Sequence, residues 1–184
     1  MFHTINDAKR CAFWRLLRYL NESGSGHSPP LRRLGLAGPS VPSPVSNSVN
    51  LDTRLQALTD DFAPIDDLQE RHSLVVDRAR RCPPLPAETR VDAHRVLGCI
   101  SAVWLTAELR DGRLHFHADA DSPLVRGLVV FLADFFNDRP PAEIAASETD
   151  PLAALELLKN LSPTRRNGLT AVRQRIRALA LALA

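Results

Sequence analysis

Three cysteines, at positions 11, 82 and 99, are the residues of this chain best suited to covalent chemistry. Their spacing includes no Cys-x-x-Cys pair and no regular repeat, which argues against a disulfide framework and against a zinc ribbon. Cys99 follows Gly98 in the mostly apolar stretch RVLGCISAVWL, residues 95–105. A thiol with no neighbouring thiol is either a small packed residue or a nucleophile that needs no resolving cysteine.

Histidines offer two further kinds of chemistry around Cys99. His94, His115 and His117 are near enough in sequence to supply the base of a cysteine-dependent hydrolase. His115 and His117 alternate along a predicted strand and, with Cys99, could form part of a metal site, although no fourth ligand is evident. A third alternative is a binding module in which Cys99 is inert. The sequence pattern alone leaves all three open.

The segment of residues 1–50 differs in composition from the rest of the chain. It is rich in Ser, Gly and Pro, with five prolines between Pro29 and Pro44. Because such a segment cannot bury enough apolar surface to offset its chain entropy, we expect residues 1–50 to be a disordered, basic leader. An organelle-import signal is the alternative for this leader. The second unit, residues 51–184, is expected to be one folded domain.

Charge is unevenly divided between these two units. Residues 1–50 carry six Lys or Arg and two acids, a balance of +4, so the overall charge of +2 leaves −2 for the remainder. A slightly acidic domain without a basic stripe is a poor partner for nucleic acid. No apolar run approaches the roughly 20 residues that cross a bilayer, so no membrane association is expected. Free thiols suit a reducing compartment, and we therefore expect a cytoplasmic location.

Helical periodicity begins at Leu51 and resumes after Pro64. Two segments show apolar residues at helical spacing, and the prolines after Cys82 end the second one. Ser122-Pro123, Asp150-Pro151 and Ser162-Pro163 each pair a capping residue with a proline at the first helical position, and so predict three later helices. In the last of these, Leu169, Val172, Ile176 and Leu179 form the predicted buried face.

Between the early and late helices the pattern changes to that of a sheet. Asp111-Gly112 separates two alternating runs and predicts a hairpin, with Leu114 and Phe116 on the face opposite His115 and His117. The stretch RVLGC predicts a further short strand, which places Cys99 on a turn at the sheet edge. The expected fold is α+β: a small antiparallel three-stranded sheet packed against several helices.

The stretch RVLGCISAVWLTAELRDGRLHFHADADSPLVRGLV resembles the core motif of the SufE-type sulfur-acceptor proteins, the Fe-S metabolism-associated domain. RCPPLPAETRVDAHRV is similar to that family's approach to the motif, and LSPTRRNGLTAVRQRIRALA to its C-terminal helix. These segments occur in the family's order and span roughly residues 53–180, nearly the whole predicted domain.

The resemblance implies a sulfur carrier. Cys99 matches the cysteine that takes persulfide sulfur from a PLP-dependent cysteine desulfurase, of the SufS or CsdA type, and so stimulates desulfuration. The sulfur then passes to an Fe-S scaffold of the SufBCD type or to another acceptor. PLP belongs to the partner, so this chain is expected to bind no cofactor or metal. It is an acceptor protein rather than an enzyme, because it acts only with the desulfurase.

Several residues around the motif are expected to support Cys99. Arg165 and Arg95 could hold the thiol or its persulfide anionic, since nearby positive charge lowers a thiol pKa. Gly98 allows close backbone approach, and Ser101 could donate a hydrogen bond to the turn or to the sulfur. Asn167 and Gly168 are expected to shape the start of the last helix.

Departures from the family pattern occur at three positions. Ile100 stands where many relatives carry Gln or Glu directly after the cysteine, Leu68 stands near a common tryptophan, and Arg166 replaces a small polar residue. These positions leave the thiol chemistry intact and bear on which desulfurase the chain serves.

Overall fold

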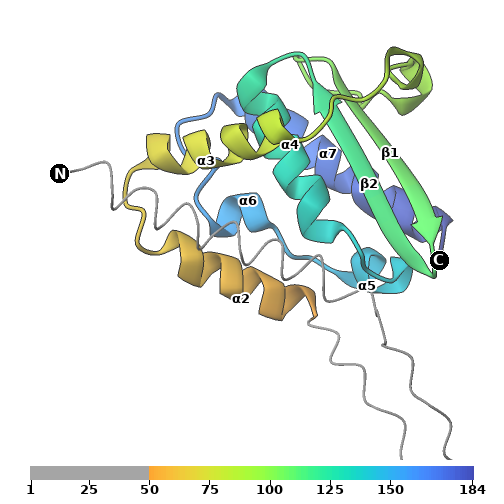
Figure 1. Cartoon of the computed structure of the whole chain (residues 1–184), viewed down its shortest axis with the longest axis horizontal. Helices are drawn as coiled ribbons and strands as arrows, with labels where there is room; N and C mark the ends of the chain where they lie inside the picture. Colours follow the sequence, from red (N-terminus) through yellow and green to blue (C-terminus); the bar gives the residue numbers. More distant parts are fainter. Residues whose placement is uncertain (1–49) are drawn as a thin grey trace, which may run out of the picture.

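A computed structural model describes residues 50–184, so residues 1–49 of the predicted leader lie outside the described residues. The described chain is α+β, as expected (Figure 1). Two helices, α2 (Leu51–Phe62) and α3 (Leu68–Arg81), precede the short 3₁₀ turns η1 (Ala87–Thr89) and η2 (Asp92–His94). The strands β1 (Val103–Arg110) and β2 (Arg113–Ala120) follow, and then α4 (Pro123–Phe136), α5 (Pro141–Ala146), α6 (Pro151–Ala154) and α7 (Pro163–Ala182).

Side chains cap four of the described helices, and the caps at Asp150 and Ser162 are those that the sequence predicted. The side chains of Asn50, Asp67, Asp150 and Ser162 each accept a backbone N–H of the helix that follows. These bonds satisfy donors that a helix leaves unpaired in its first turn. Ser122 occupies the N-cap position of α4 but makes no capping bond with its side chain, and Pro123 begins the helix.

The hairpin forms at the predicted turn. β1 and β2 pair antiparallel from Val103 opposite Ala120 to Arg110 opposite Arg113. Asp111 and Gly112 join them with φ values of 51° and 74°, which are the positive values that a tight hairpin turn requires. Leu114 is buried on the inner face, as the alternation predicted.

The predicted third strand is wrong. The sheet has two strands, and the RVLGC stretch contributes one isolated bridge between Arg95 and Trp104, supported by a 2.8 Å bond from Val96 N to Val103 O. A longer ladder cannot form because the chain turns at once through Gly98, at φ 89°, and doubles back on its own next strand. The segment that carries Cys99 is therefore a tight loop rather than a strand end.

The core is built around α4. This helix buries residues on most of its circumference, including Leu128, Phe131, Leu132 and Phe135, because it packs against β2 on one side and α3 on another. Figure 1 shows α7 passing behind the hairpin and α4 alongside β2, with α2 and α6 on the side away from the hairpin. Leu169, Val172 and Ile176 form the buried face of α7, as predicted. No helix of the described residues is long and apolar enough to cross a membrane.

Candidate functional site

Cys99 lies on the loop that leads into β1. The Arg95–Trp104 bridge closes the base of this loop, and Gly98 supplies the positive φ that turns it. The same backbone conformation would strain any residue with a Cβ. The base of the loop is therefore fixed, and Cys99 lies at the open end of the hairpin, far from the tight turn that joins its strands.

Helix α7 receives the cysteine side chain. The Cys99 Sγ donates a hydrogen bond to the carbonyl oxygen of Gly168, 3.3 Å away. A Cβ at position 168 would lie 3.0 Å from that Sγ and 3.3 Å from the Cys99 Cα, closer than ordinary van der Waals contact. Gly168 is thus the residue that lets the loop lie against the first turns of α7.

A small, open pocket lies beside the thiol. Buried Val125 and Leu169 contribute apolar surface to it, from the starts of α4 and α7. The exposed Arg165 lines it with a positive charge. The full set of lining residues is Cys99, Ile100, Ser101, Val125, Thr164, Arg165, Gly168 and Leu169. A group attached to Sγ would therefore lie beside apolar surface and one positive charge.

Burial raises the pKa of the Cys99 thiol above its ordinary value. The bond to the Gly168 carbonyl acts in the same direction, because only the protonated sulfur can donate it. This direction is opposite to the one expected from arginines near the thiol. In this arrangement the cysteine is held as a protonated, weakly nucleophilic thiol.

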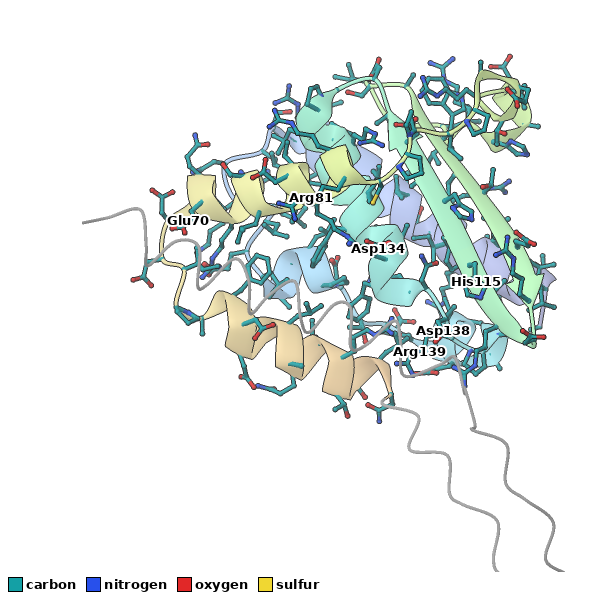
Figure 2. All side chains as sticks on the ribbon, in the orientation of Figure 1. Glu70, Arg81, His115, Asp134, Asp138 and Arg139 are labelled. Carbon is teal, nitrogen blue, oxygen red and sulfur yellow. The ribbon has the colours of Figure 1, made fainter. Side chains whose placement is uncertain are left out.

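The histidines named as candidate bases or ligands do not line this pocket. His117 and His115 pair with Thr106 and Glu108, three and five residues along β1 from Val103. At about 3.3 Å per residue they lie roughly 10 and 16 Å along the strand from its loop end. Figure 2 shows His115 on the hairpin near the start of β2, toward the tight turn. Within residues 50–184 no group of three or more His, Cys, Asp or Glu side chains could hold a metal ion.

Comparison with known proteins fits the geometry of this loop. Residues 56–180 match the family model described as "SufE: Fe-S metabolism associated domain". The chain belongs to the SufE family. That span contains the hairpin, the Cys99 loop and most of α7, so the family match covers the whole candidate site.

Individual relatives agree with this membership. An uncharacterized SufE-like protein of Rhizobium etli is 34% identical over 128 residues, which is 67% of this chain and 86% of that protein. The sulfur acceptor protein CsdE of Escherichia coli is 30% identical over 66% of this chain and 84% of its own length. A hypothetical protein of Thermus thermophilus, solved in solution, shares the fold, with a TM-score of 0.59 at 19% identity, over 71% of this chain and 95% of that one. SufE membership implies a desulfurase as partner.

The structure brings together some of the predicted supporting residues of this SufE-family chain. Ser101 and Arg165 line the pocket with Cys99, and Gly98 directly precedes the cysteine. The Ser101 hydroxyl makes no hydrogen bond within the described residues, so its loop-fixing role stays a prediction. Arg95 is exposed at the loop base, and Asn167 is exposed on α7 outside the pocket lining.

Sequence reasoning missed how closely α7 and the loop approach each other. Gly168 was expected only to shape the start of α7, and its carbonyl instead accepts the thiol. Thr164, Val125 and Leu169 were not expected at the site either. The Ser-Pro and Asn-Gly signals did mark the segment, but no local pattern says which distant loop packs on a helix start.

A buried carboxylate on β2 braces the base of the loop. Asp119 is 2% exposed, and its two oxygens lie 2.7 Å from Arg126 Nε and 2.6 Å from Arg90 Nη2. The Arg90 guanidinium also lies 5.8 Å from the ring centroid of Trp104, whose backbone makes the closing bridge. Arg126 in turn donates to the carbonyls of Ala79 and Cys82 at the end of α3. The helices α3 and α4 and both strands are therefore joined at the base of the Cys99 loop.

Cys82, the other described thiol, is at the C-cap of α3, as predicted. It is partly buried, and burial followed by the charge of Asp134 raises its pKa. It does not line the pocket. These surroundings agree with a packing role for Cys82 at the end of α3.

Proposed function

We propose that Cys99 is the persulfide acceptor through which this chain acts as a sulfur acceptor in Fe-S metabolism. The observation that carries the proposal is the placement of one thiol on a tight loop, next to an open pocket and apart from the other described thiol, Cys82. A carrier needs this separation, because a second thiol nearby would attack the persulfide and release its sulfur.

The transfer step is thiolate attack without net oxidation. The Cys99 thiolate attacks the outer sulfur of the desulfurase persulfide, forming a new S–S bond. The old S–S bond breaks, and the desulfurase cysteine leaves as a thiolate. Cys99 then carries the extra sulfur as its own persulfide. The proton that Cys99 loses beforehand passes to solvent or to the partner.

The pocket suits the product of this step. Val125 and Leu169 are buried beside the thiol and would shield the outer sulfur from water, while Arg165 would face its negative charge. A guanidinium close to an anionic sulfur stabilises it by Coulomb attraction. Arg165, Ser101 and Gly98 are thus the residues that we assign to support of the loaded form, with Arg95 and Asn167 at its margins.

Loading requires the loop to leave α7. In the present arrangement the thiol is protonated and bound to the Gly168 carbonyl, and both features reduce its reactivity. Rotation about Gly98 would release Sγ toward a docked partner, because glycine changes backbone conformation at little steric cost. The closed state then protects the cargo, and the open state exchanges it.

The finer assignments follow from the same proposal. The donor is a PLP-dependent desulfurase of the SufS or CsdA type, and the recipient is a SufBCD-type scaffold or another sulfur acceptor. We place the protein in the cytoplasm, with residues 51–184 as the carrier domain and residues 1–50 as a leader. The chain itself contributes the thiol and its surroundings, and the desulfurase contributes PLP chemistry.

Desulfurase kinetics test the assignment of Cys99. Addition of the full chain to a cysteine desulfurase should raise alanine formation from cysteine, since removal of the enzyme persulfide frees it for another turnover. Cys99→Ser should abolish this stimulation, and the matched variant Cys82→Ser should retain it. Full stimulation by Cys99→Ser would refute the proposal.

A further inference from the structure

Two large aliphatic side chains stand exposed on either side of the candidate nucleophile. Leu97 is 80% exposed and Ile100 is 77% exposed, the highest values among the large exposed hydrophobic residues of the described chain. They lie two residues before and one residue after Cys99. A single exposed leucine on a surface is ordinary, but two on one short loop beside a thiol form a paired apolar feature.

The fold does not need these side chains. The loop is held by the Arg95–Trp104 bridge, the turn at Gly98 and the contact of Cys99 with Gly168. Neither Leu97 nor Ile100 belongs to the buried core or to the partly buried residues packed against it. Polar residues at both positions would leave the same backbone contacts in place. The pair therefore contributes surface rather than stability.

Charge on the surrounding surface is positive on the α7 side. Arg165 lines the pocket together with Ile100, and Arg95 lies at the base of the loop. Both are exposed, and neither side chain makes an ion pair or a hydrogen bond within residues 50–184. Unpaired arginines beside apolar residues are typical of protein interfaces, where Arg and apolar anchors are enriched.

The position of Leu97 and Ile100 beside Cys99 restricts which protein can cover these two side chains. A protein that delivers sulfur to the Cys99 Sγ must bring its own sulfur within bonding distance. Ile100, which lines the same pocket, and Leu97, two residues before the cysteine, are exposed apolar side chains next to that point of approach. We propose that Leu97 and Ile100 are paired anchors that enter an apolar recess of the cysteine desulfurase, bordered by acidic groups that face Arg95 and Arg165. The pair then determines which desulfurase loads this chain. This inference rests on the proposed function.

The test compares Leu97→Gln, Ile100→Gln and the double variant with wild type in the full chain. Leu181→Gln, 62% exposed near the end of α7, is the matched control. One SufS-type and one CsdA-type desulfurase are titrated with each protein, and the concentration for half-maximal stimulation is read from alanine formation. For the desulfurase that wild type stimulates more, the double variant should raise that concentration about tenfold or more while maximal stimulation is kept.

Two further readouts separate docking from thiol chemistry. Iodoacetamide should alkylate Cys99, and inorganic polysulfide should load it, at the same rate in wild type and in Leu97→Gln, because Leu97 does not line the pocket. Higher ionic strength should raise the half-maximal concentration of wild type, and should do so less in Arg95→Gln.

The outcomes are distinct. If wild type is loaded normally and the double variant has a half-maximal concentration within about twofold of the wild-type value, the anchor proposal fails and the proposed function stands. Failure of wild type to stimulate either desulfurase overturns the proposed function and the anchors with it. If the double variant abolishes a wild-type dimer in solution and leaves desulfurase stimulation unchanged, the pair is a self-association surface and the proposal fails.

Discussion

At the scale of single residues, the site depends on the contact between Cys99 and Gly168. The thiol donates to the Gly168 carbonyl, and the missing Cβ of Gly168 makes the 3.3 Å distance attainable. A carrier cysteine must be inert between partners and reactive with them, and this contact provides the inert state. Its two consequences, a raised thiol pKa and a steric limit at position 168, can each be measured.

The pKa of Cys99 predicts slow alkylation at neutral pH. Because burial raises that pKa, the thiolate fraction is reduced, and the rate with iodoacetamide should rise with a midpoint above the ordinary value of about 8.5. Unfolding in urea should return the midpoint to the ordinary value. Mass spectrometry of the digested protein measures Cys99 separately from Cys11 and Cys82. A midpoint in the folded protein below that of the unfolded chain would contradict this account.

Gly168→Ala should push the loop away from α7. The new Cβ would lie 3.0 Å from Sγ, and relief of that overlap should expose the thiol and speed its alkylation about fivefold, equivalent to about 1 kcal/mol of overpacking. Alanine also favours a helix over glycine by about 1 kcal/mol, so overall stability should change little. Asn167→Ala, on the same turn, is the control and should leave the rate unchanged. Equal alkylation rates in Gly168→Ala and Asn167→Ala would show that the close contact between Cys99 and Gly168 does not hold the loop against α7.

At the scale of elements, β2 and α4 support the loop through Asp119. This carboxylate joins Arg126 of α4 to Arg90 of the segment that follows α3, and Arg90 lies over Trp104 of β1. Breaking one partner of a buried ion pair leaves the others without compensation. The stability of the loop base therefore depends on the ion pairs of Asp119 with the two arginines.

Asp119→Asn should lower the free energy of unfolding by about 3 kcal/mol, because two arginines lose their buried counter-charge. Urea denaturation provides the measurement. Asp121→Asn, an exposed neighbour on the same segment, should change stability by no more than about 0.5 kcal/mol. The same loss should loosen the Cys99 loop and speed alkylation of Cys99. Indistinguishable denaturation midpoints for the two variants would remove Asp119 from the support of the loop.

At the scale of the whole molecule, the sequence predicted the order of helices and strands better than the contacts between them. The Asp111-Gly112 hairpin, the end of α3 near Cys82 and the Ser-Pro start of α7 follow from local backbone preferences, and all three are confirmed. The third strand was predicted from a short apolar run, and Gly98 turns the chain before a ladder can form.

What the sequence could not provide are the contacts between distant segments. Arg54 of α2 is buried and donates to the Phe135 and Asn137 carbonyls at the end of α4, and helical periodicity would place an arginine outside. Burial lowers the pKa of Arg54 to about 10. The meeting of Cys99 with Gly168 is of the same kind, since 69 residues separate them. Such contacts depend on the packing of whole elements.

Transfer of one sulfur atom to one side chain is the central claim for the molecule as a whole. The most direct measurement incubates the full chain with a cysteine desulfurase and free cysteine, and then maps the added mass by mass spectrometry of non-reduced peptides. The account predicts a gain of one sulfur atom on the peptide that contains Cys99, and no gain on that peptide in Cys99→Ser. A gain confined to Cys11 or Cys82, or no gain at all beside an active desulfurase, would contradict it.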